Sequence, residues 1–298
     1  MAVPQPGIFA QGTRSHYHLE FDVRPDATDA EIVTALHGLR EPTVTVGGAN
    51  IVVGFGSDLA RRLIPDDVPD DAQPFPGVSG PAGVVPATPH DIWVWIHGTG
   101  EDVLLDVARA ISACFAPVAT LAAEQPGFVY RDSRDLTGFI DGTENPPVEV
   151  AHEVAIVADG PGAGGSHVIA ARFVHDLERF HAQPDESQQD TIGRTKPESI
   201  ELDPLPDTSH IGRVQIEEDG DELEIYRRSV PFGMVGEHGL YFIAFSADPS
   251  RYLKMLAAMY GTSGDGLQDR LMEFTTPVSG AFYFAPSLDA LAGILPSE

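Results

Sequence analysis

The stretch LYFIAFSADPSRYLKMLAAMYG, residues 240–261, decides the fold because it contains a strand and a helix in direct succession. Residues 240–246 are almost all apolar or aromatic, which is typical of a buried strand. Asp248 then supplies a capping side chain and Pro249 stands at the first helical position, and this order predicts a helix start. We expect the helix to run to about Tyr260 and to end at Gly261.

The same alternation of strands and helices extends outward from this stretch over the whole chain. In the second half the pattern predicts a short helix at 187–193 and further strands at 166–174, 222–228 and 281–285. In the first half it predicts amphipathic helices at 29–39 and 101–115 and strands at 17–23, 51–55 and 91–97. Residues 65–89 are rich in Pro, Asp and Gly and predict a long surface loop.

Both halves share the order strand, helix, strands, helix, strand, which indicates a structural repeat with little sequence identity. Antiparallel sheets with helices packed outside, an α+β architecture, are the simplest outcome. We expect one half at residues 1–147 and the other at 148–298. The joint lies between Pro146-Pro147 and the glycine-rich run 160–165.

The composition is that of a globular protein with a strong negative charge. The chain has 298 residues, of which 42% are hydrophobic and 21% charged, and its formal charge is −27. A field of this sign repels nucleic acid and anionic membranes, so we exclude both as partners. A contribution to solubility is the simpler interpretation of the charge.

The single cysteine, Cys114, excludes an intrachain disulfide and a thiolate metal site. Because it lies in an apolar helical pattern, we expect it to be a small core residue, on one face with Val103, Leu104, Val107 and Ile111. The N-terminus has no basic region followed by an apolar stretch, and no segment approaches the roughly 18 apolar residues of a membrane span. We therefore expect an unprocessed cytoplasmic protein.

Residues 138–146 (GFIDGTENP) form the most specific segment. Asp141 stands there between two glycines, Gly138 and Gly142. Glycine lets the backbone approach a flat ligand closely, and an aspartate held at that place can act as a general acid or base. A turn in which Asp and Asn form local hydrogen bonds is an equally good interpretation of the pattern alone.

Two other segments are 207–214 (DTSHIGRV), with His210, and 226–233 (YRRSVPFG), with Arg227 and Arg228. Taken singly, one histidine among eleven is more often structural than a ligand, and two arginines at a strand end are more often surface charge. The acidic run 217–222 (EEDGDE) lacks the alternating ligand spacing of a calcium loop. It predicts a solvated hairpin turn.

Together these segments resemble the dye-decolourising peroxidase family, in its bacterial B-type branch, over nearly the whole chain. The resemblance also includes 131–137 (RDSRDLT), 192–196 (IGRTK) and 282–286 (FYFAP), all in the same order. It implies two ferredoxin-like halves, with haem b held mainly by the C-terminal half.

On one side of the haem, the resemblance implies that His210 ligates the iron through a neutral imidazole nitrogen. A carboxylate normally holds the other ring nitrogen. We favour Asp269 for this role, and Glu273 is the alternative. Gly142 is expected to contact the cofactor. Arg194 resembles a haem propionate partner, although a surface salt bridge is nearly as good an interpretation.

On the other side, Asp141 resembles the family's proton-shuttling aspartate and Arg227 its arginine, which stabilises charge on peroxide oxygens. Ser229 stands where B-type members often have Asn. Its hydroxyl can hold a water, but its shorter reach makes direct contact with bound peroxide less favourable.

The implied activity is a haem-dependent peroxidase that reduces hydrogen peroxide to water through a ferryl intermediate and oxidises dyes, phenolics or other one-electron donors. The main alternative is a haem-binding protein for haem delivery, storage or iron release. A cofactor-free ferredoxin-like binding module is a third class. The expected partners are hydrogen peroxide, small-molecule reductants and further copies of the chain in a homo-oligomer.

Overall fold

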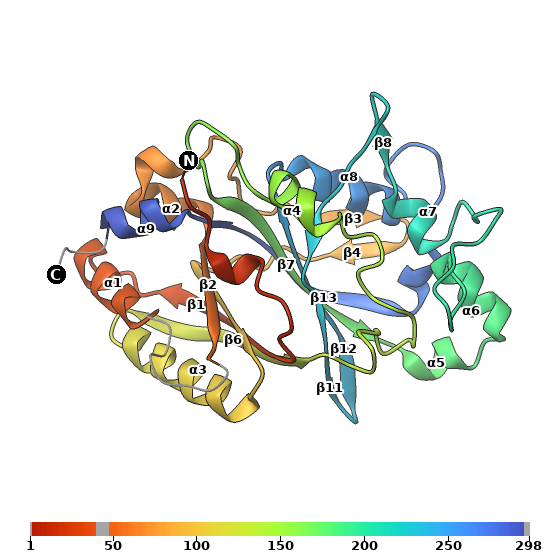
Figure 1. Ribbon diagram of the computed structural model, residues 1–298, viewed down its shortest axis with the longest axis horizontal. Coiled ribbons are helices and arrows are strands. Elements are labelled where there is room, and N and C mark those ends of the chain that lie inside the picture. The colour runs from red at the N-terminus through yellow and green to blue at the C-terminus, as the bar shows by residue number, and fades with distance from the viewer. Residues whose placement is uncertain (1, 40–47, 295–298) are drawn as a thin grey trace.

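The N-terminal half of the chain forms four long strands with two helices on one side (Figure 1). The structure, a computed structural model, describes residues 2–39 and 48–294. The main elements of this half are β1 (Ser15–Val23), α1 (Asp29–Leu36), β2 (Asn50–Phe55), β5 (Ile92–Gly98), α3 (Glu101–Phe115) and β6 (Ala119–Phe128). The strands are antiparallel and lie in the order β2-β5-β1-β6.

The C-terminal half repeats this succession, with a longer helical insertion after its first strand. Its elements are β7 (Ser166–His175), α5 (Leu177–His181), α6 (Asp185–Ile192), α7 (His210–Val214), β10 (Tyr226–Arg227), β11 (Val230–Met234), β12 (Glu237–Ser246), α8 (Ser250–Met259) and β13 (Thr275–Ala285). The order is β10-β12-β7-β13, and β11 also pairs with β12. The spatial order of the strands is therefore the same in both halves.

The predicted antiparallel sheets with helices are confirmed in kind, but the two sheets are not separate. Phe284 of β13 pairs with Phe55 of β2, and this bridge joins the strands of both halves into one nine-stranded sheet. A Cβ on Gly54 would lie 3.0 Å from the Cβ of Tyr283. Glycine at position 54 therefore lets the two strands approach.

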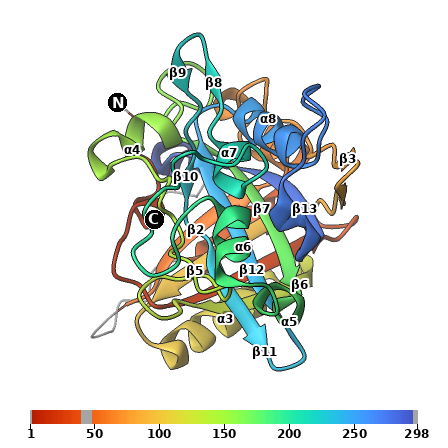
Figure 2. The same ribbon diagram turned by 90° about the vertical axis from the view of Figure 1, so that its right-hand side faces the viewer.

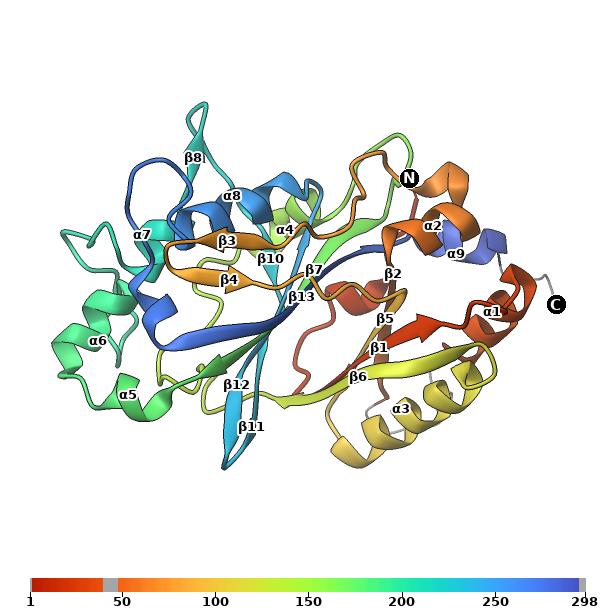
Figure 3. The ribbon, with the colours of Figure 1, turned by 180° about the vertical axis from the view of Figure 1, so that it is seen from behind.

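The core is divided into layers by the sheets. One apolar cluster lies between the two halves and contains Trp93 and Trp95 of β5 with Tyr241 and Phe245 of β12. A second cluster lies under α1 and α3, and a third lies under α8. Figures 1 and 3 show these helices on the outer sides of the molecule, so the strands of each half are covered on both faces.

Helix α3 has the predicted bounds, but the prediction that Cys114 is a core residue is wrong. Cys114 is exposed. The buried positions of the helix have the spacing i, i+4, i+7, i+11 and are Leu104, Ala108, Ile111 and Phe115. Phe115 packs on Phe21 of β1, with ring centroids 5.0 Å apart. The buried stripe therefore passes through the residue after the cysteine.

Residues 65–89 are more ordered than the predicted surface loop. They contain η3 (Pro65–Asp67) and a hairpin of β3 (Val78–Gly80) and β4 (Gly83–Val85), which lies along α8 (Figure 3). Phe75 and Val85 are only 2% and 1% exposed. A Cβ on Gly80 would lie 2.1 Å from the carbonyl oxygen of Tyr260, so this glycine allows the hairpin to contact the end of α8.

The predicted strand 222–228 is wrong in extent. β8 (Glu217–Glu218) and β9 (Asp221–Glu222) form an exposed hairpin that projects from the molecule (Figure 2), and β10 begins only at Tyr226. The prediction of a solvated hairpin turn at 217–222 is confirmed.

The remaining elements are η1 (Pro6–Ile8), η2 (His37–Leu39), α2 (Ser57–Leu63), α4 (Val148–Ala155), η4 (Arg270–Glu273) and α9 (Leu288–Ile294). Among the described residues, no helix combines the length and hydropathy needed to cross a bilayer.

Candidate active site

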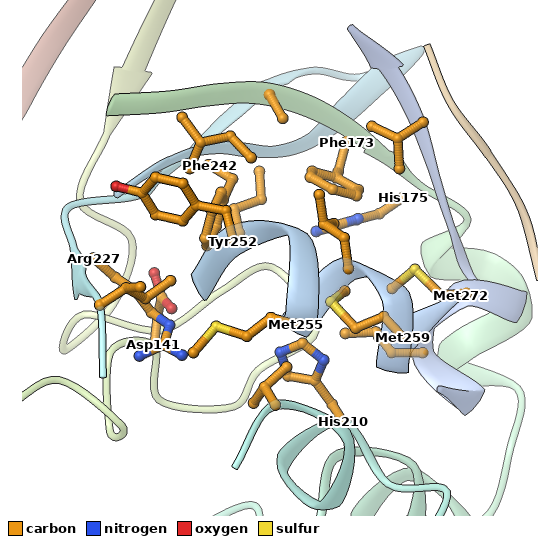
Figure 4. Close-up of a pocket in the computed structure, with 18 residues that line it drawn as sticks. Asp141, Phe173, His175, His210, Arg227, Phe242, Tyr252, Met255, Met259 and Met272 are labelled. Carbon is orange, nitrogen blue, oxygen red and sulfur yellow. The ribbon is translucent and has the colours of Figure 1, made fainter. Parts of the chain in front are cut away.

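An apolar cavity lies between the C-terminal sheet, α7 and α8 (Figure 4). It contains about 860 Å³ of empty space, including the part open to solvent. Of its 18 lining residues, 13 are apolar, and the other five are Asp141, His175, His210, Arg227 and Tyr252. A cavity with this lining and few polar groups suits a largely apolar ligand.

His210 is the first residue of α7, where a cap fixes its position. The Ser209 hydroxyl accepts a hydrogen bond from the backbone N of Gly212 at 3.1 Å. The His210 Nδ1 lies 2.7 Å from Oδ2 of the buried Asp269, whose other oxygen accepts from the backbone N of Leu271. The carboxylate can only accept, so the imidazole ring donates its hydrogen bond from Nδ1. The other ring nitrogen, Nε2, then carries a free lone pair, and His210 lines the cavity.

Glu273, the alternative partner for His210, lies elsewhere. Its carboxylate and backbone carbonyl both accept from Arg179. Of the two carboxylates, the structure therefore brings Asp269 to the histidine. Asp269 reaches it because it caps η4 with its other oxygen, which points the side chain back toward α7.

A second histidine, His175 at the end of β7, also lines the cavity, but both of its ring nitrogens are engaged. Nδ1 lies 2.8 Å from the Thr275 hydroxyl, and Nε2 lies 3.2 Å from Oδ1 of Asp135. Thr137 donates two further hydrogen bonds to Asp135. Burial opposes ionisation of Asp135, but the hydrogen bond and charge of His175 and the Thr137 donors together lower its pKa to about 2. His210 is thus the cavity histidine with a free nitrogen.

Asp141 is positioned by the turn that its neighbours form. Its backbone N donates to the carbonyl of Ser133 at 2.9 Å, and Gly142 adopts φ +75°, which glycine tolerates without strain. Burial and then the charge of Asp135 raise the pKa of Asp141 from 3.8 to about 6, against the opposing effects of the Gly142 N–H and Arg227. Asp141 can therefore donate or accept a proton near neutral pH.

Arg227 is held by residues that follow Asp141 in the same loop. The backbone N of Arg227 donates to Asn145 Oδ1 at 2.7 Å, and its carbonyl accepts from Asn145 Nδ2 at 2.9 Å. Its Nη1 donates to the carbonyl of Glu144 at 2.8 Å. Figure 4 shows the guanidinium beside the Asp141 carboxyl. Burial lowers the pKa of Arg227, but the guanidinium stays charged.

Comparison with known proteins decides the family. Models of the N-terminal and C-terminal parts of Dyp-type peroxidases match residues 5–129 and 132–290. The chain belongs to the Dyp-type peroxidase family. The prediction of a peroxidase of this family from its sequence segments is confirmed.

Individual Dyp-type proteins are similar over almost the full length. A dye-decolorizing peroxidase of Rhodococcus erythropolis is 35% identical, with 97% of this chain and 88% of that protein covered. The structure of a dye-decolorizing protein from V. cholerae is 35% identical, covers 97% of this chain and 99% of its own, and has a TM-score of 0.88. A DypB variant from Rhodococcus jostii RHA1, solved in complex with haem, is 32% identical, with coverages of 98% and 99% and a TM-score of 0.89.

Four residues that the Dyp-type resemblance assigned to the site lie outside the lining of the apolar cavity, namely Asp269, which contacts His210, and Gly142, Ser229 and Arg194. Gly142 and Ser229 line a second, neighbouring cavity, and the Ser229 hydroxyl is 3.4 Å from the carbonyl of Ile243. Arg194 forms ion pairs with Glu144 at 2.5 Å and Glu201 at 3.3 Å. The contacts of Arg194 are therefore those of a salt bridge. The Nε of Arg194 has no hydrogen-bond partner among the described residues.

The second cavity, here called the arginine chamber, shares Asp141 and Arg227 with the apolar cavity. It contains about 1270 Å³ of empty space, including the part open to solvent. Its lining also includes Arg14, Arg134 and Arg228. The Asp141–Arg227 pair thus stands between an apolar compartment and a polar one that opens to solvent.

Sequence reasoning missed Asp135, His175 and Asn145. Asp135 and Asn145 stood inside the segment 131–146, yet nothing local distinguishes them from turn formers. His175 is 40 residues from Asp135 and at a strand end, so only the fold reveals their contact.

Proposed function

We propose that this chain is a haem-dependent peroxidase that reduces hydrogen peroxide and oxidises dyes, phenolics or other one-electron donors. One observation carries the proposal. A single apolar cavity is lined by His210, whose Nε2 is free, and by Asp141 and Arg227. Relatives are dye-decolorizing peroxidases, and a DypB structure contains haem. Haem b is the cofactor.

The residues of the apolar cavity fit this cofactor. The 13 apolar side chains suit the macrocycle, and His210 offers an unprotonated nitrogen that no other group in the described structure engages. Asp269 keeps the histidine in the required tautomer and orientation. The unpartnered Nε of Arg194 remains a candidate donor to a propionate. Bound haem supplies the redox chemistry, while the chain supplies ligation, proton handling and access.

Asp141 and Arg227 handle protons and charge on the peroxide. In its ionised form Asp141 accepts the first proton of hydrogen peroxide, and in its protonated form it returns that proton to the departing oxygen. A pKa near 6 makes both forms accessible near neutral pH. Arg227 donates to the oxygens while negative charge develops on them. The arginine chamber gives peroxide a polar route to this pair, with Ser229 on its wall.

Finer assignments accompany this proposal. The chain is a B-type member, and its halves, 1–147 and 148–298, are ferredoxin-like, which the shared strand order supports. The C-terminal half holds most of the haem, since 16 of the 18 cavity residues follow residue 148. Residues 130–147 also contact that half.

The chain forms a homo-oligomer, for which β6, at the edge of the sheet, offers a pairing surface.

Stopped-flow mixing of haem-loaded protein with hydrogen peroxide tests the proposed function. We expect a rapid change in the Soret band and subsequent oxidation of a dye. Arg227→Leu should slow the Soret change at least about tenfold, or about 1.4 kcal/mol of barrier. Arg109→Leu, in the exposed part of α3, is the matched control and should react like wild type.

Two outcomes would contradict the proposal and identify its alternatives. Wild-type protein that binds haem but shows no peroxide-dependent change would indicate haem delivery or storage. Wild-type protein that binds no haem would indicate a cofactor-free binding module.

A further inference from the structure

The arginine chamber has a charge opposite to that of the whole chain. Its charged lining consists of one carboxyl group, Asp141, and the arginines Arg14, Arg134, Arg227 and Arg228. Even with Asp141 ionised, four positive groups face one negative group, whereas the chain carries −27. A concentration of positive charge inside such an acidic protein calls for a specific explanation.

Three of the four guanidinium groups of the chamber are held by backbone carbonyls rather than by carboxylates. Within residues 2–39 and 48–294, no carboxylate forms an ion pair with Arg134, Arg227 or Arg228. Arg228 donates to the carbonyls of Ile8 and Ala10, both at 2.7 Å, and Arg134 also donates to backbone carbonyls. Carbonyl dipoles orient these side chains, but they leave the guanidinium groups without an ion-pair partner in a partly buried place.

A neutral donor in the chamber wall also lacks an acceptor of good geometry. His16 is 3% exposed, and its Nδ1 accepts a hydrogen bond from Trp95 Nε1 at 3.1 Å. Burial, and next the charge of Arg228, lower the pKa of His16 to about 3, so the ring is neutral and its proton is on Nε2. That Nε2 has no hydrogen-bond partner of good geometry among the described residues, and only the backbone of Thr13 acts on the ring as an acceptor, opposing the fall in its pKa. Buried donors are normally paired.

We propose that the arginine chamber is a binding site for a small planar oxyanion, a carboxylate or nitrate, held beside Asp141. Planar guanidinium groups match the geometry of such anions and can donate two hydrogen bonds to each. The anion would bring negative charge into direct contact with guanidinium groups that form no ion pair in the described structure, and its oxygens could accept from His16. Because it lies next to Asp141, the anion binds more tightly when that carboxyl is protonated, and it competes with peroxide for the chamber.

Calorimetric titration of the haem-loaded protein with sodium nitrate tests this site. We expect saturable binding at one site, tighter at pH 5 than at pH 7.5, without a shift of the Soret band, because the anion does not replace a ligand on iron. Arg228→Gln and Arg14→Gln should each weaken binding at least about tenfold. Arg109→Gln removes the same charge from the exposed face of α3 and should leave the affinity unchanged.

Three results would overturn the site. The first is that nitrate gives no saturable heat of binding at either pH. The others are that Arg14→Gln and Arg109→Gln bind nitrate with equal affinity, or that the wild-type affinity is equal at the two pH values. Binding only to haem-free protein would mean that the arginines serve the cofactor's own carboxylates. If Arg228→Gln does not fold, Arg14→Gln still decides, since Arg14 is exposed at the chamber rim. Peroxide reactivity is measured separately, so failure here leaves the peroxidase proposal intact.

Discussion

Asp135 and Asp141 are six residues apart in one loop, yet their pKa values are shifted in opposite directions. Asp135 receives hydrogen bonds from His175 and Thr137, and its pKa falls to about 2. Asp141 has fewer donors, and burial with the nearby Asp135 charge raises its pKa to about 6. When the environments of two carboxyl groups separate their pKa values, the groups can take different roles. Here Asp135 has the structural role and Asp141 the proton-transfer role.

The raised pKa of Asp141 predicts a pH-dependent cost to stability. Because its folded-state pKa is above the ordinary 3.8, the native state binds more protons between about pH 4 and 6, and the ionised carboxyl opposes folding above pH 6. Asp141→Asn should therefore raise the free energy of unfolding at pH 7.5 by up to about 3 kcal/mol. The gain should disappear below about pH 4. Urea unfolding of both proteins across this range measures it, and a gain independent of pH would refute the electrostatic cause.

At this scale the sequence revealed only the residues that stand in distinctive local patterns. Asp141 between glycines, His210 and Arg227 could be selected because each lies in a segment typical of the family. The His175–Asp135 contact joins a strand end to a distant loop, and no local pattern indicates it. The ion pairs of Arg194 depend on where α6 ends relative to the loop at Glu144, which is also a property of the fold.

At the scale of elements, the site depends on how the loop after β6 is tied to β10. Asn145 uses both amide atoms on the backbone of Arg227, and Arg134 ties the same loop to the carbonyls of Gly138 and Lys196. β10 itself is only two residues long and lies at the sheet edge. The loop therefore does much to position the arginine.

Asn145→Ala should loosen this connection. The loss of two partly buried hydrogen bonds should lower the free energy of unfolding by about 2 kcal/mol. Displacement of Arg227 should also slow the reaction of the haem-loaded protein with peroxide. Chemical unfolding and stopped-flow absorbance measure the two effects. Asn145→Asp, which retains an acceptor for the Arg227 N–H, should show a smaller loss. Wild-type values of both quantities in Asn145→Ala would contradict the role of this clamp.

Regular elements were predictable where hydrophobic periodicity is strong. The strand–helix unit at 240–261 appears as β12 and α8, and the helix at 101–115 appears as α3. The β3–β4 hairpin was missed because its glycines and prolines are typical of loops, and only packing against α8 makes it regular. The error at Cys114 has a similar cause, since periodicity does not distinguish a border position from its buried neighbour Phe115.

At the scale of the whole molecule, the charge of −27 should select among reducing substrates. At pH 7 and low salt it should repel sulfonated anionic dyes and attract cationic dyes, and added salt should screen both effects. We therefore expect salt to raise kcat/KM for an anionic dye and to lower it for a cationic dye. Steady-state oxidation of one dye of each kind, at two salt concentrations, measures this. If salt leaves both values unchanged, global charge has no role in substrate encounter.

The central claim is that His210 is the residue through which the chain binds haem and becomes a peroxidase. Absorption and resonance Raman spectra of His210→Ala, with and without added imidazole, test it most directly. We predict that the variant binds haem weakly or with an altered Soret band, loses the iron–histidine mode, and regains a histidine-like spectrum when imidazole enters the space of the missing ring. A variant with the wild-type Soret band and iron–histidine mode would show that another histidine is the ligand, and His175, the other histidine of the cavity lining, would be the first candidate.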